Sequence, residues 1–215
     1  MRWIPVSVNI NPLFHWLGRQ PYESMWQKMQ QRAAEVAAGT QGEVVWACEH
    51  DPVYTTGRRG IDNRVQTGLD VPLMHTDRGG ETTFHGPGQV MLYPVISLRR
   101  HAISPRGYVH LLEQSCIDCL KEMGASVTRR EGLPGVWAED GKIAAIGLRI
   151  SGGVAYHGMA LNVDVDAKWF AAINACGTGL SSVNLGAKPG RTLPLDSLAK
   201  AWAAHFVRLL SAASN

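Results

Sequence analysis

The sequence predicts a single domain of the α+β class that covers residues 1–215. A chain of 215 residues is long enough to bury a full core, and this length commonly forms one domain. Three stretches show the apolar spacing of helices, and short apolar runs bounded by glycine, proline or aspartate lie between them. With 45% hydrophobic and 18% charged residues, the composition is that of an ordinary globular protein.

The first part of the chain contains one expected helix and two expected strands. Residues 6–10 alternate weakly and indicate an opening strand, and residues 43–49 form an apolar run typical of a buried strand. Residues 21–38 predict a helix, because Pro21 suits a first turn and Gly39 can end it. The apolar stripe of this helix consists of Met25, Met29, Ala33 and Val36.

Residues 50–71 form a long polar connection, which in a compact domain usually indicates function or mobility. The glycine-rich stretch 78–89 leads into an expected strand, residues 90–97. Its glycines let main-chain amides approach a bound molecule. It lacks the ending of a Walker loop and does not open a helix, so it is either a ligand-binding loop or a plain turn-rich loop.

The stretch 78–89 contains Phe84-His85-Gly86, an aromatic-His-Gly unit that recurs at Tyr156-His157-Gly158. The repetition suggests the hypothesis that the two units line opposite walls of one cleft. The alternative for each histidine taken alone is a hydrogen-bonded structural role.

The second half of the chain predicts two further helices and two short strands. Residues 105–123 form the first helix, with Ser104 as its N-cap, and residues 196–212 form the closing helix. Strands at 126–128 and 135–138 flank a turn expected at 133–135. The apolar stripe of the closing helix consists of Leu198, Trp202, His205, Phe206 and Leu209.

The stretch 140–176 organises the rest of the chain, and it begins with a hairpin. Asp140-Gly141 forms a tight turn, Lys142 opens an apolar strand, and Gly152-Gly153 folds it back onto a second strand, residues 156–163.

Gly147, Gly158 and Ala160 leave the centre of this hairpin without large side chains. Glycine weakens a strand unless something approaches the backbone closely, and a ligand is one candidate. On this interpretation Gly147→Val or Gly158→Val obstructs the ligand slot and leaves the fold largely intact.

Charge and hydropathy argue against nucleic-acid binding, membrane spanning and secretion. A net charge of +3 is too small to indicate nucleic-acid binding by itself. Arg58-Arg59 and Arg99-Arg100 either dock acidic protein partners or lie in solvated loops. No segment has the apolar length of a membrane span or a secretory signal, so we expect a cytoplasmic protein.

The chain has four cysteines, which we expect to be free thiols. Cys116 and Cys119 have a metal-binding spacing, but they fall within a helical pattern and lack a second pair. The spacing therefore favours two core thiols over a zinc site.

Cys176 differs from the other cysteines because it follows a polar segment and precedes Gly177. A thiol of ordinary pKa, about 8.5, is mostly protonated at neutral pH, so a catalytic cysteine needs a nearby base or cation. Lys142 is the partner that we expect, and His85 and His157 remain alternatives.

Five blocks of sequence carry a resemblance to a known family, and they occur in its order along the chain. They are residues 49–59, 78–89, 141–147, 157–163 and 174–177. Together they resemble the octanoyl-[acyl-carrier-protein]:protein N-octanoyltransferases of lipoate biosynthesis. The resemblance implies the fold of lipoate and biotin protein ligases, which is a mixed β-sheet flanked by helices.

The resemblance also implies a reaction through a cysteine thioester. Cys176 takes an octanoyl group from acyl carrier protein, and Lys142 lowers the pKa of the thiol and assists proton transfer. The acceptors are lysine amines on the lipoyl domains of 2-oxoacid dehydrogenases and on the glycine-cleavage H protein. No ATP, other cofactor, metal, nucleic acid or membrane is implied.

The implied acyl site brings together parts of three of these blocks, and His157 is a possible supporting residue. Its lining residues are Arg78, Gly79, Gly80, Glu81, Thr82, Thr83, Phe84, His85, Ala145, Ile146, Gly147, Gly158, Met159 and Ala160.

Two departures from the family pattern lie near Cys176. Ala175 stands where proline is frequent, and the loop that follows is shortened, with Asn184 where threonine is usual. Two alternative functions remain: an ATP-dependent lipoate or biotin protein ligase, and a non-catalytic acyl-binding domain in which Cys176 is a core thiol.

Overall fold

A seven-stranded mixed sheet forms the centre of this computed structural model, which describes residues 11–60, 70–173, 181–186 and 194–213. Its strands are β1 (Leu13–Gln20), β2 (Val44–His50), β6 (Gln89–Ser97), β7 (Thr128–Arg130), β8 (Leu133–Trp137), β9 (Lys142–Ser151) and β10 (Val154–Asn162). They lie in the order β1-β2-β6-β10-β9-β8-β7. β1 pairs with β2 in parallel, and the other neighbours pair antiparallel.

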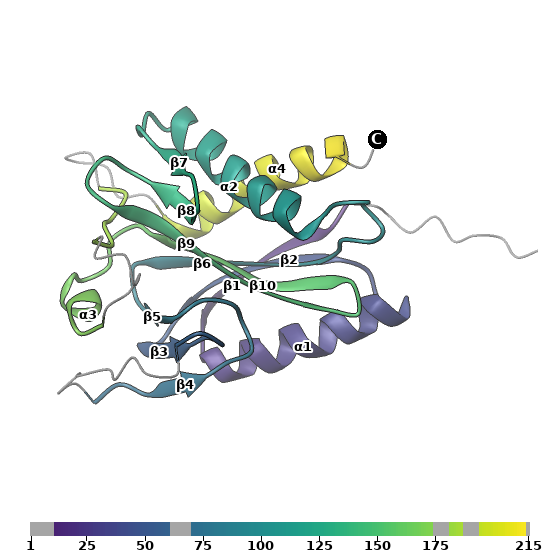
Figure 1. Ribbon diagram of the computed structural model, residues 1–215, viewed down its shortest axis with the longest axis horizontal. Coiled ribbons are helices and arrows are strands. Elements are labelled where there is room, and N and C mark those ends of the chain that lie inside the picture. The colour runs from purple at the N-terminus through teal and green to yellow at the C-terminus, as the bar shows by residue number, and fades with distance from the viewer. Residues whose placement is uncertain (1–10, 61–69, 174–180, 187–193, 214–215) are drawn as a thin grey trace, which may run out of the picture.

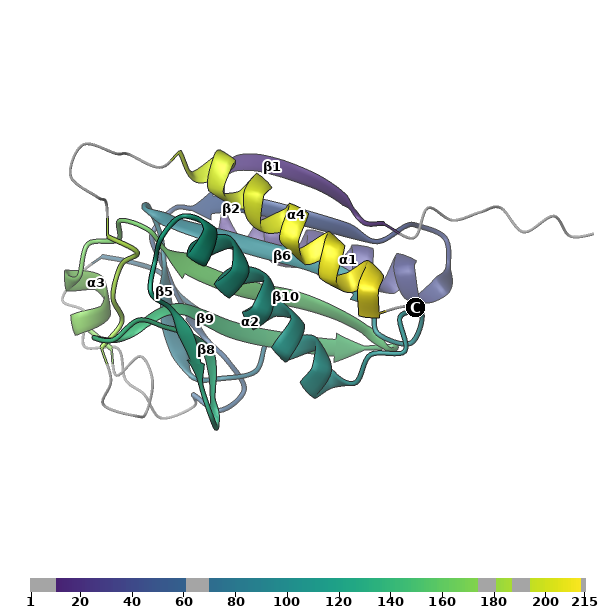
Figure 2. The same cartoon turned by 90° about the horizontal axis from the view of Figure 1, so that it is seen from above.

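Helices cover both faces of this sheet (Figures 1 and 2). α1 (Tyr22–Ala38) packs on one face, and α2 (Pro105–Glu122) and α4 (Leu195–Ala213) pack on the other. A second sheet of β3 (Val53–Thr56), β4 (Leu73–His75) and β5 (Thr82–His85) lies beside the start of α1. The short helix α3 (Lys168–Ala171) contacts β5. The predicted α+β class with a mixed sheet and flanking helices is confirmed.

Alternating side chains of the central strands build two separate cores. In β2, Val45 and Ala47 join the core under α2 and α4, whereas Val44, Trp46 and Cys48 join the core under α1. Successive residues of a strand point to opposite faces, so a strand covered on both sides is apolar throughout. This is why residues 44–48 read as a continuous apolar run.

Several predicted elements are confirmed to within a few residues. α1 begins after Pro21 and ends at Gly39, which has the left-handed φ of +73° that glycine adopts easily. Its predicted stripe is buried, as is that of α4 except for the partly buried Leu209. In α2 the Ser104 hydroxyl accepts a hydrogen bond from the Gly107 amide at 3.1 Å, as the N-cap prediction requires.

The predicted opening strand at residues 6–10 lies outside the described residues. The first described strand is instead β1, which the sequence analysis missed. It has no β-branched residue, and its pairing with β2 shifts register between Trp16 and Arg19, where Gly18 has a φ of +66°. Such a bulged edge strand carries little of the alternation by which strands are recognised.

Three further expectations at the element level are wrong. The connection at 50–71 contains β3, and the glycine-rich stretch 78–89 contains β5. Residues 133–135 lie within β8 rather than in a turn, because the chain reverses earlier, at Gly132, where φ is +73°. α3 was not predicted at all, since four residues are too few to show a helical period.

The predicted core thiols are confirmed. Cys116 and Cys119, both on α2, are buried in the core that α2 and α4 share with the sheet, and burial raises the pKa of both thiols. Among the residues that the structure describes, no helix combines the length and the hydropathy needed to cross a bilayer.

Candidate active site

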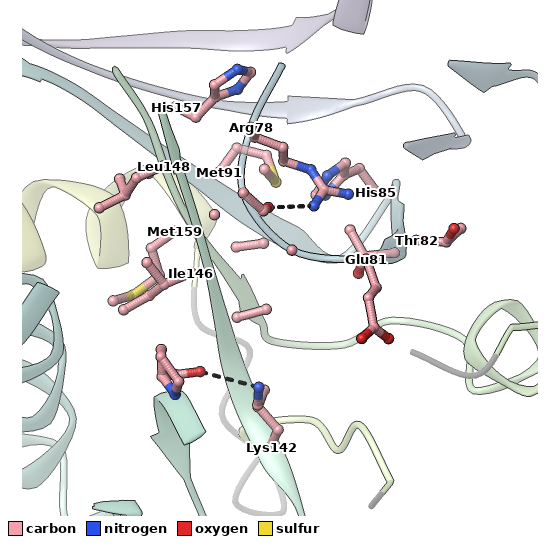
Figure 3. A pocket seen from close by; sticks show the side chains of 18 of the residues that line it. Arg78, Glu81, Thr82, His85, Met91, Lys142, Ile146, Leu148, His157 and Met159 are labelled. Atoms are coloured by element: carbon pink, nitrogen blue, oxygen red, sulfur yellow. Dashed lines mark hydrogen bonds between the residues drawn. The ribbon is translucent and has the colours of Figure 1, made fainter. Parts of the chain in front are cut away.

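The β9–β10 hairpin supplies one wall of a cavity of about 810 Å³. Across the hairpin Gly147 pairs with Gly158 and Ala145 pairs with Ala160, so these four residues share one face. We call them the small-residue floor. Figure 3 shows Ile146, Leu148 and Met159 projecting to the opposite side of the strands from Arg78 and His85. At these four positions the hairpin therefore offers only backbone, hydrogens and methyl groups.

Close packing against neighbouring chain segments explains both glycines of the floor. A Cβ on Gly158 would lie 2.0 Å from the Leu92 carbonyl oxygen of β6. A Cβ on Gly147 would lie 3.0 Å from the Arg78 side chain and 3.2 Å from the Gly79 carbonyl oxygen. The groups that approach these two glycines closely are therefore parts of the protein itself. Gly158→Val would disrupt the pairing of β10 with β6, rather than only obstruct a ligand slot.

A kink in β10 redirects His157. The ladder between β10 and β6 is interrupted around Pro94, which has no N–H to donate. His157 lies in the left-handed region with a φ of +60°, which is uncommon for a residue other than glycine. This strained backbone conformation directs the imidazole toward Asp77, with which it forms a hydrogen bond.

The cavity brings together nearly all of the residues predicted for the acyl site. Lys142, His157 and thirteen of the fourteen predicted lining residues border it. Phe84 does not, because it points to the other face of β5 and stacks on Trp169 with ring centroids 4.9 Å apart. Cys176 lies outside the described residues. Both histidines of the repeated aromatic-His-Gly units border the same cavity.

Asp77 is a partly buried anchor for the loop that begins at Arg78, and no local sequence signal marks it. Its carboxylate accepts hydrogen bonds from Trp26 Nε1 at 2.8 Å, from His157 Nε2 at 2.8 Å and from the Tyr156 hydroxyl. Burial alone would raise the pKa of Asp77, but these donors outweigh burial and lower it. The anionic carboxylate therefore ties the loop to α1 and β10.

His157 is held neutral in this network. Burial lowers its pKa, and the neighbouring Asp77 carboxylate opposes that effect only in part. Nε2 carries the proton donated to Asp77, and buried Nδ1 has no hydrogen-bond partner among the described residues. His157 thus serves the loop anchor, which is the structural alternative left open by the sequence.

Arg78 lies at the back of the cavity with its guanidinium almost fully buried. It donates to the Thr55 carbonyl oxygen at 2.6 Å, the Thr55 hydroxyl at 2.8 Å and the Gly79 carbonyl oxygen at 3.0 Å. Burial lowers the pKa of Arg78. Because these acceptors are neutral, Arg78 brings positive potential to this part of the cavity wall.

A cluster of polar rings closes the deep end of the cavity, and the sequence analysis missed it as well. His50 Nδ1 donates to the Gln20 carbonyl oxygen at 2.7 Å, which leaves Nε2 to accept from the Tyr93 hydroxyl at 2.8 Å. Tyr22 stacks on His85, with ring centroids 5.5 Å apart. These rings come from distant parts of the chain, so no local motif marks them.

Other lining residues escaped prediction for the same reason. Gln89 and Asn162 are exceptions, because a polar residue at the end of an apolar strand can be noticed in the sequence. Their buried side chains form a 2.8 Å hydrogen bond. The other missed lining residues are Tyr22, Arg58, Arg59, Met91, Tyr93, Val109, Gly132, Leu133, Pro134, Leu148, Phe170 and Ser182.

Lys142 lies at the edge of the cavity where β8 and β9 meet. Its Nζ donates to the Pro134 carbonyl oxygen at 3.1 Å, drawn as a dashed line in Figure 3, and lies 4.8 Å from the centre of the Trp137 ring. Its backbone N–H donates to the Ser181 carbonyl oxygen at 2.9 Å, and its carbonyl accepts from Val183 at 3.0 Å. The chain just after the undescribed residues 174–180 therefore runs beside Lys142.

The sequence matches a protein family and is similar to several octanoyltransferases. Residues 21–207 match the family described as the lipoyl protein ligase A/B catalytic domain. The chain is 48% identical over 161 residues to an octanoyltransferase from Thiobacillus denitrificans, covering 75% of this chain and 73% of that one. It is 40% identical over 201 residues to an octanoyltransferase from Halorhodospira halophila, covering 93% and 92% of the two chains.

Solved structures share the fold at low sequence identity. A bipartite lipoate protein ligase from Thermoplasma acidophilum superimposes with a TM-score of 0.71 at 14% identity, covering 94% of this chain and 84% of that one. A biotin protein ligase from Aquifex aeolicus gives a TM-score of 0.57 at 11% identity, with 93% and 70% covered. At such identities the likeness concerns the fold alone.

Proposed function

This chain belongs to the lipoyl protein ligase A/B catalytic domain family and, within it, to the octanoyltransferases, and from this premise we propose how its cavity serves the reaction. It is an acyltransferase that transfers an octanoyl group in protein lipoylation. We further propose that residues 1–215 form one catalytic domain. The observation that carries the mechanism is the placement of Lys142 at the end of a cavity floored by small residues.

The first half-reaction transfers the acyl group to Cys176. The thiolate attacks the carbonyl carbon of an octanoyl thioester on acyl carrier protein, and a C–S bond to Cys176 forms. The old C–S bond breaks, and the departing carrier thiolate takes a proton from the Lys142 ammonium. One thioester replaces another, so this step is close to thermoneutral.

The second half-reaction transfers the acyl group to a protein lysine. The neutral amine attacks the Cys176 thioester, the amide C–N bond forms, and the Cys176 thiolate leaves. Lys142, now neutral, accepts the proton that the attacking nitrogen loses. The free enzyme is restored. Because the conversion of a thioester to an amide is thermodynamically favourable, no nucleotide is required.

The described residues on either side of Cys176 support this assignment. Phe170 precedes it, Ser182 follows it, and both border the cavity. Ser181 is five residues after Cys176, so the two Cα atoms cannot be more than about 18 Å apart. Since Ser181 is hydrogen-bonded to the Lys142 backbone, the chain is short enough to bring the thiol to the ammonium.

The remaining cysteines are poor candidates for the nucleophile. Cys48, Cys116 and Cys119 are at most 2% exposed. Burial raises the pKa of each, so their thiolates are scarce at neutral pH.

The octanoyl chain is proposed to lie along the small-residue floor. An alkyl chain of about seven carbons buried in this way gains roughly 5 kcal/mol, at about 0.8 kcal/mol per methylene. Arg78 and the glycine-rich loop lie against one end of the floor, and Lys142 lies toward the other. Thr83 and His85 border the same space.

The proposed donor is octanoyl-acyl carrier protein, and the proposed acceptors are lipoyl domains of 2-oxoacid dehydrogenases and the glycine-cleavage H protein. Arg58 and Arg59 support an acidic donor, because both are exposed and border the cavity. Their turn is hydrogen-bonded to the glycine-rich loop, with the Arg58 amide 3.0 Å from the Arg78 carbonyl oxygen. A positive rim suits a phosphodiester-linked arm and its acidic carrier.

Transfer in the absence of nucleotide tests this function. Purified protein mixed with an octanoyl-loaded carrier and a lipoyl domain should produce an octanoyl amide, and the same protein with free octanoate and ATP should not. Transfer that needs ATP and free acid would establish the ligase alternative. Full activity of Cys176→Ser would remove the thioester intermediate from the mechanism.

A further inference from the structure

One peptide group joins Lys142 to a buried carboxylate on α2. The Pro134 carbonyl oxygen accepts a hydrogen bond from Lys142 Nζ at 3.1 Å. The N–H of the same peptide unit, on Gly135, donates to Glu113 Oε1 at 3.0 Å. In a trans peptide the oxygen and the hydrogen point in opposite directions, so the unit lies between the carboxylate and the ammonium.

The Lys142 side chain packs against the same peptide unit. Gly135 has a φ of +131°, and a Cβ there would lie 2.5 Å from the Ala144 carbonyl oxygen and 3.4 Å from two carbons of the Lys142 side chain. The lysine stem therefore packs directly on a bare glycine. The Trp137 ring, whose centre is 4.8 Å from Nζ, adds a favourable cation–π contact.

Glu113 is unusual for its position on the helix. It is 3% exposed and lies on the apolar face of α2 beside Leu112 and Cys116. Besides the Gly135 amide, it is faced by Arg129 Nε from β7 at 3.2 Å and by His110 Nδ1 on its own helix at 3.4 Å. Arg130, also on β7, approaches the Trp137 ring to 4.6 Å. A buried carboxylate is costly unless it is paired, and here one oxygen accepts the hydrogen bond of the Pro134–Gly135 peptide.

We propose that Glu113 is a positioning residue for Lys142, acting through the Pro134–Gly135 peptide. This inference rests on the proposed role of Lys142 beside Cys176. The carboxylate lies at the N–H end of the peptide dipole and the ammonium at its C=O end, so each hydrogen bond polarises and strengthens the other. A fixed ammonium stabilises the Cys176 thiolate, and a mobile one does so less.

The pH dependence of Cys176 alkylation by iodoacetamide measures this effect, with the modified site confirmed by mass spectrometry. Glu113→Met removes the acceptor for Gly135 and should raise the midpoint, slowing alkylation at pH 7 about fivefold, the equivalent of one hydrogen bond. Glu113→Gln keeps an uncharged acceptor and should give a smaller rise. Arg129→Gln is the matched control, since it removes the ion pair but not the Gly135 contact, and should leave the midpoint unchanged.

A Glu113→Gln midpoint equal to that of the wild type would overturn the inference, even if Glu113→Met does not fold. A lower midpoint would also overturn it, because removal of a negative charge that acts only through space favours the thiolate. Lys142→Met separates the two proposals. If it leaves the midpoint unchanged, the role of Lys142 fails and the inference fails with it. If Lys142→Met raises the midpoint and the Glu113 variants do not, only the inference fails.

Discussion

Polar rings packed at the deep end of the cavity give several residues unusual protonation behaviour. Burial raises the pKa of Tyr22 to about 12 and lowers that of His50 to about 4. Burial also lowers the pKa of His85, and the positive charge of Arg78 adds to this effect. At neutral pH the imidazoles are therefore uncharged and the phenols protonated, so the cluster presents hydrogen bonds without net charge.

His50 should make the stability depend on pH. Its pKa falls from 6.5 to about 4 on folding, so the unfolded chain binds the proton first as the pH decreases. The stability that neutral His50 contributes is complete above pH 6.5 and is lost as the pH falls toward 4, a change of about 3 kcal/mol. Urea unfolding across this range should show a smaller decrease for His50→Gln. Equal decreases in the two proteins would show that His50 does not cause it.

The two glycines of the small-residue floor should respond differently to alanine. Gly158→Ala places a methyl group against the Leu92 carbonyl and should reduce the free energy of unfolding by about 2 kcal/mol or more. Gly147→Ala contacts the flexible Arg78 side chain and the Gly79 carbonyl, so it should fold while slowing octanoyl transfer. Urea denaturation and the transfer rate measure the two effects. A stable, active Gly158→Ala protein would contradict the packing described here.

At the scale of elements, Asp77 holds three of them together. Its carboxylate joins the loop that begins at Arg78 to α1 through Trp26 and to β10 through Tyr156 and His157. Hydrogen bonds to a charged group contribute more than neutral ones, so we expect this side chain to contribute strongly to how the loop lies over the floor.

Asp77→Asn should lower the free energy of unfolding by about 2 kcal/mol and slow octanoyl transfer, because the amide cannot accept all three hydrogen bonds. Trp26→Phe is the control, since it removes one donor and leaves the contacts to β10. It should retain most of the activity. If Asp77→Asn matches the wild type in both measurements, the loop is held by other contacts.

The elements that could be predicted from sequence are those with strong local signals. α1 has proline before it, glycine after it and an apolar stripe, and the β9–β10 hairpin is bounded by Gly141 and by Gly152-Gly153. β1, β3 and β5 carry no such signal, because short or bulged strands next to polar loops are fixed by their partners rather than by their own sequence.

Much of the site could also be predicted, because its residues fall in compact motifs within the glycine-rich loop and the hairpin. Phe84 was misplaced because a motif does not reveal which face of a strand each residue takes. Asp77, Tyr93 and Glu113 were missed because their roles come from partners far away in the chain. Only the folded arrangement shows those contacts.

On the scale of the whole molecule, the two basic pairs lie in different places relative to the cavity. Arg58 and Arg59 border the cavity, whereas Arg99 lies beside Gly153, at the turn of the β9–β10 hairpin. The chain has a net charge of only +3, so we expect local groups, rather than the overall charge, to attract the proposed acidic carrier.

Arg58→Glu should raise the KM for the octanoyl-loaded carrier and weaken its dependence on salt, with little change in kcat. The reason is that a rim charge mainly affects encounter with the partner. Arg99→Glu is the matched control with the same change of charge, and it should leave the KM near that of the wild type. Equal effects of the two substitutions would mean that overall charge, not the cavity rim, attracts the carrier.

Intact-mass spectrometry after mixing the protein with octanoyl-loaded acyl carrier protein tests the central claim most directly. The mechanism predicts a single octanoyl adduct on the wild-type chain, which disappears when a lipoyl domain is added. It predicts no adduct on Cys176→Ser. An adduct of the same mass on Cys176→Ser, or octanoyl transfer to the lipoyl domain by that variant at the wild-type rate, would contradict it.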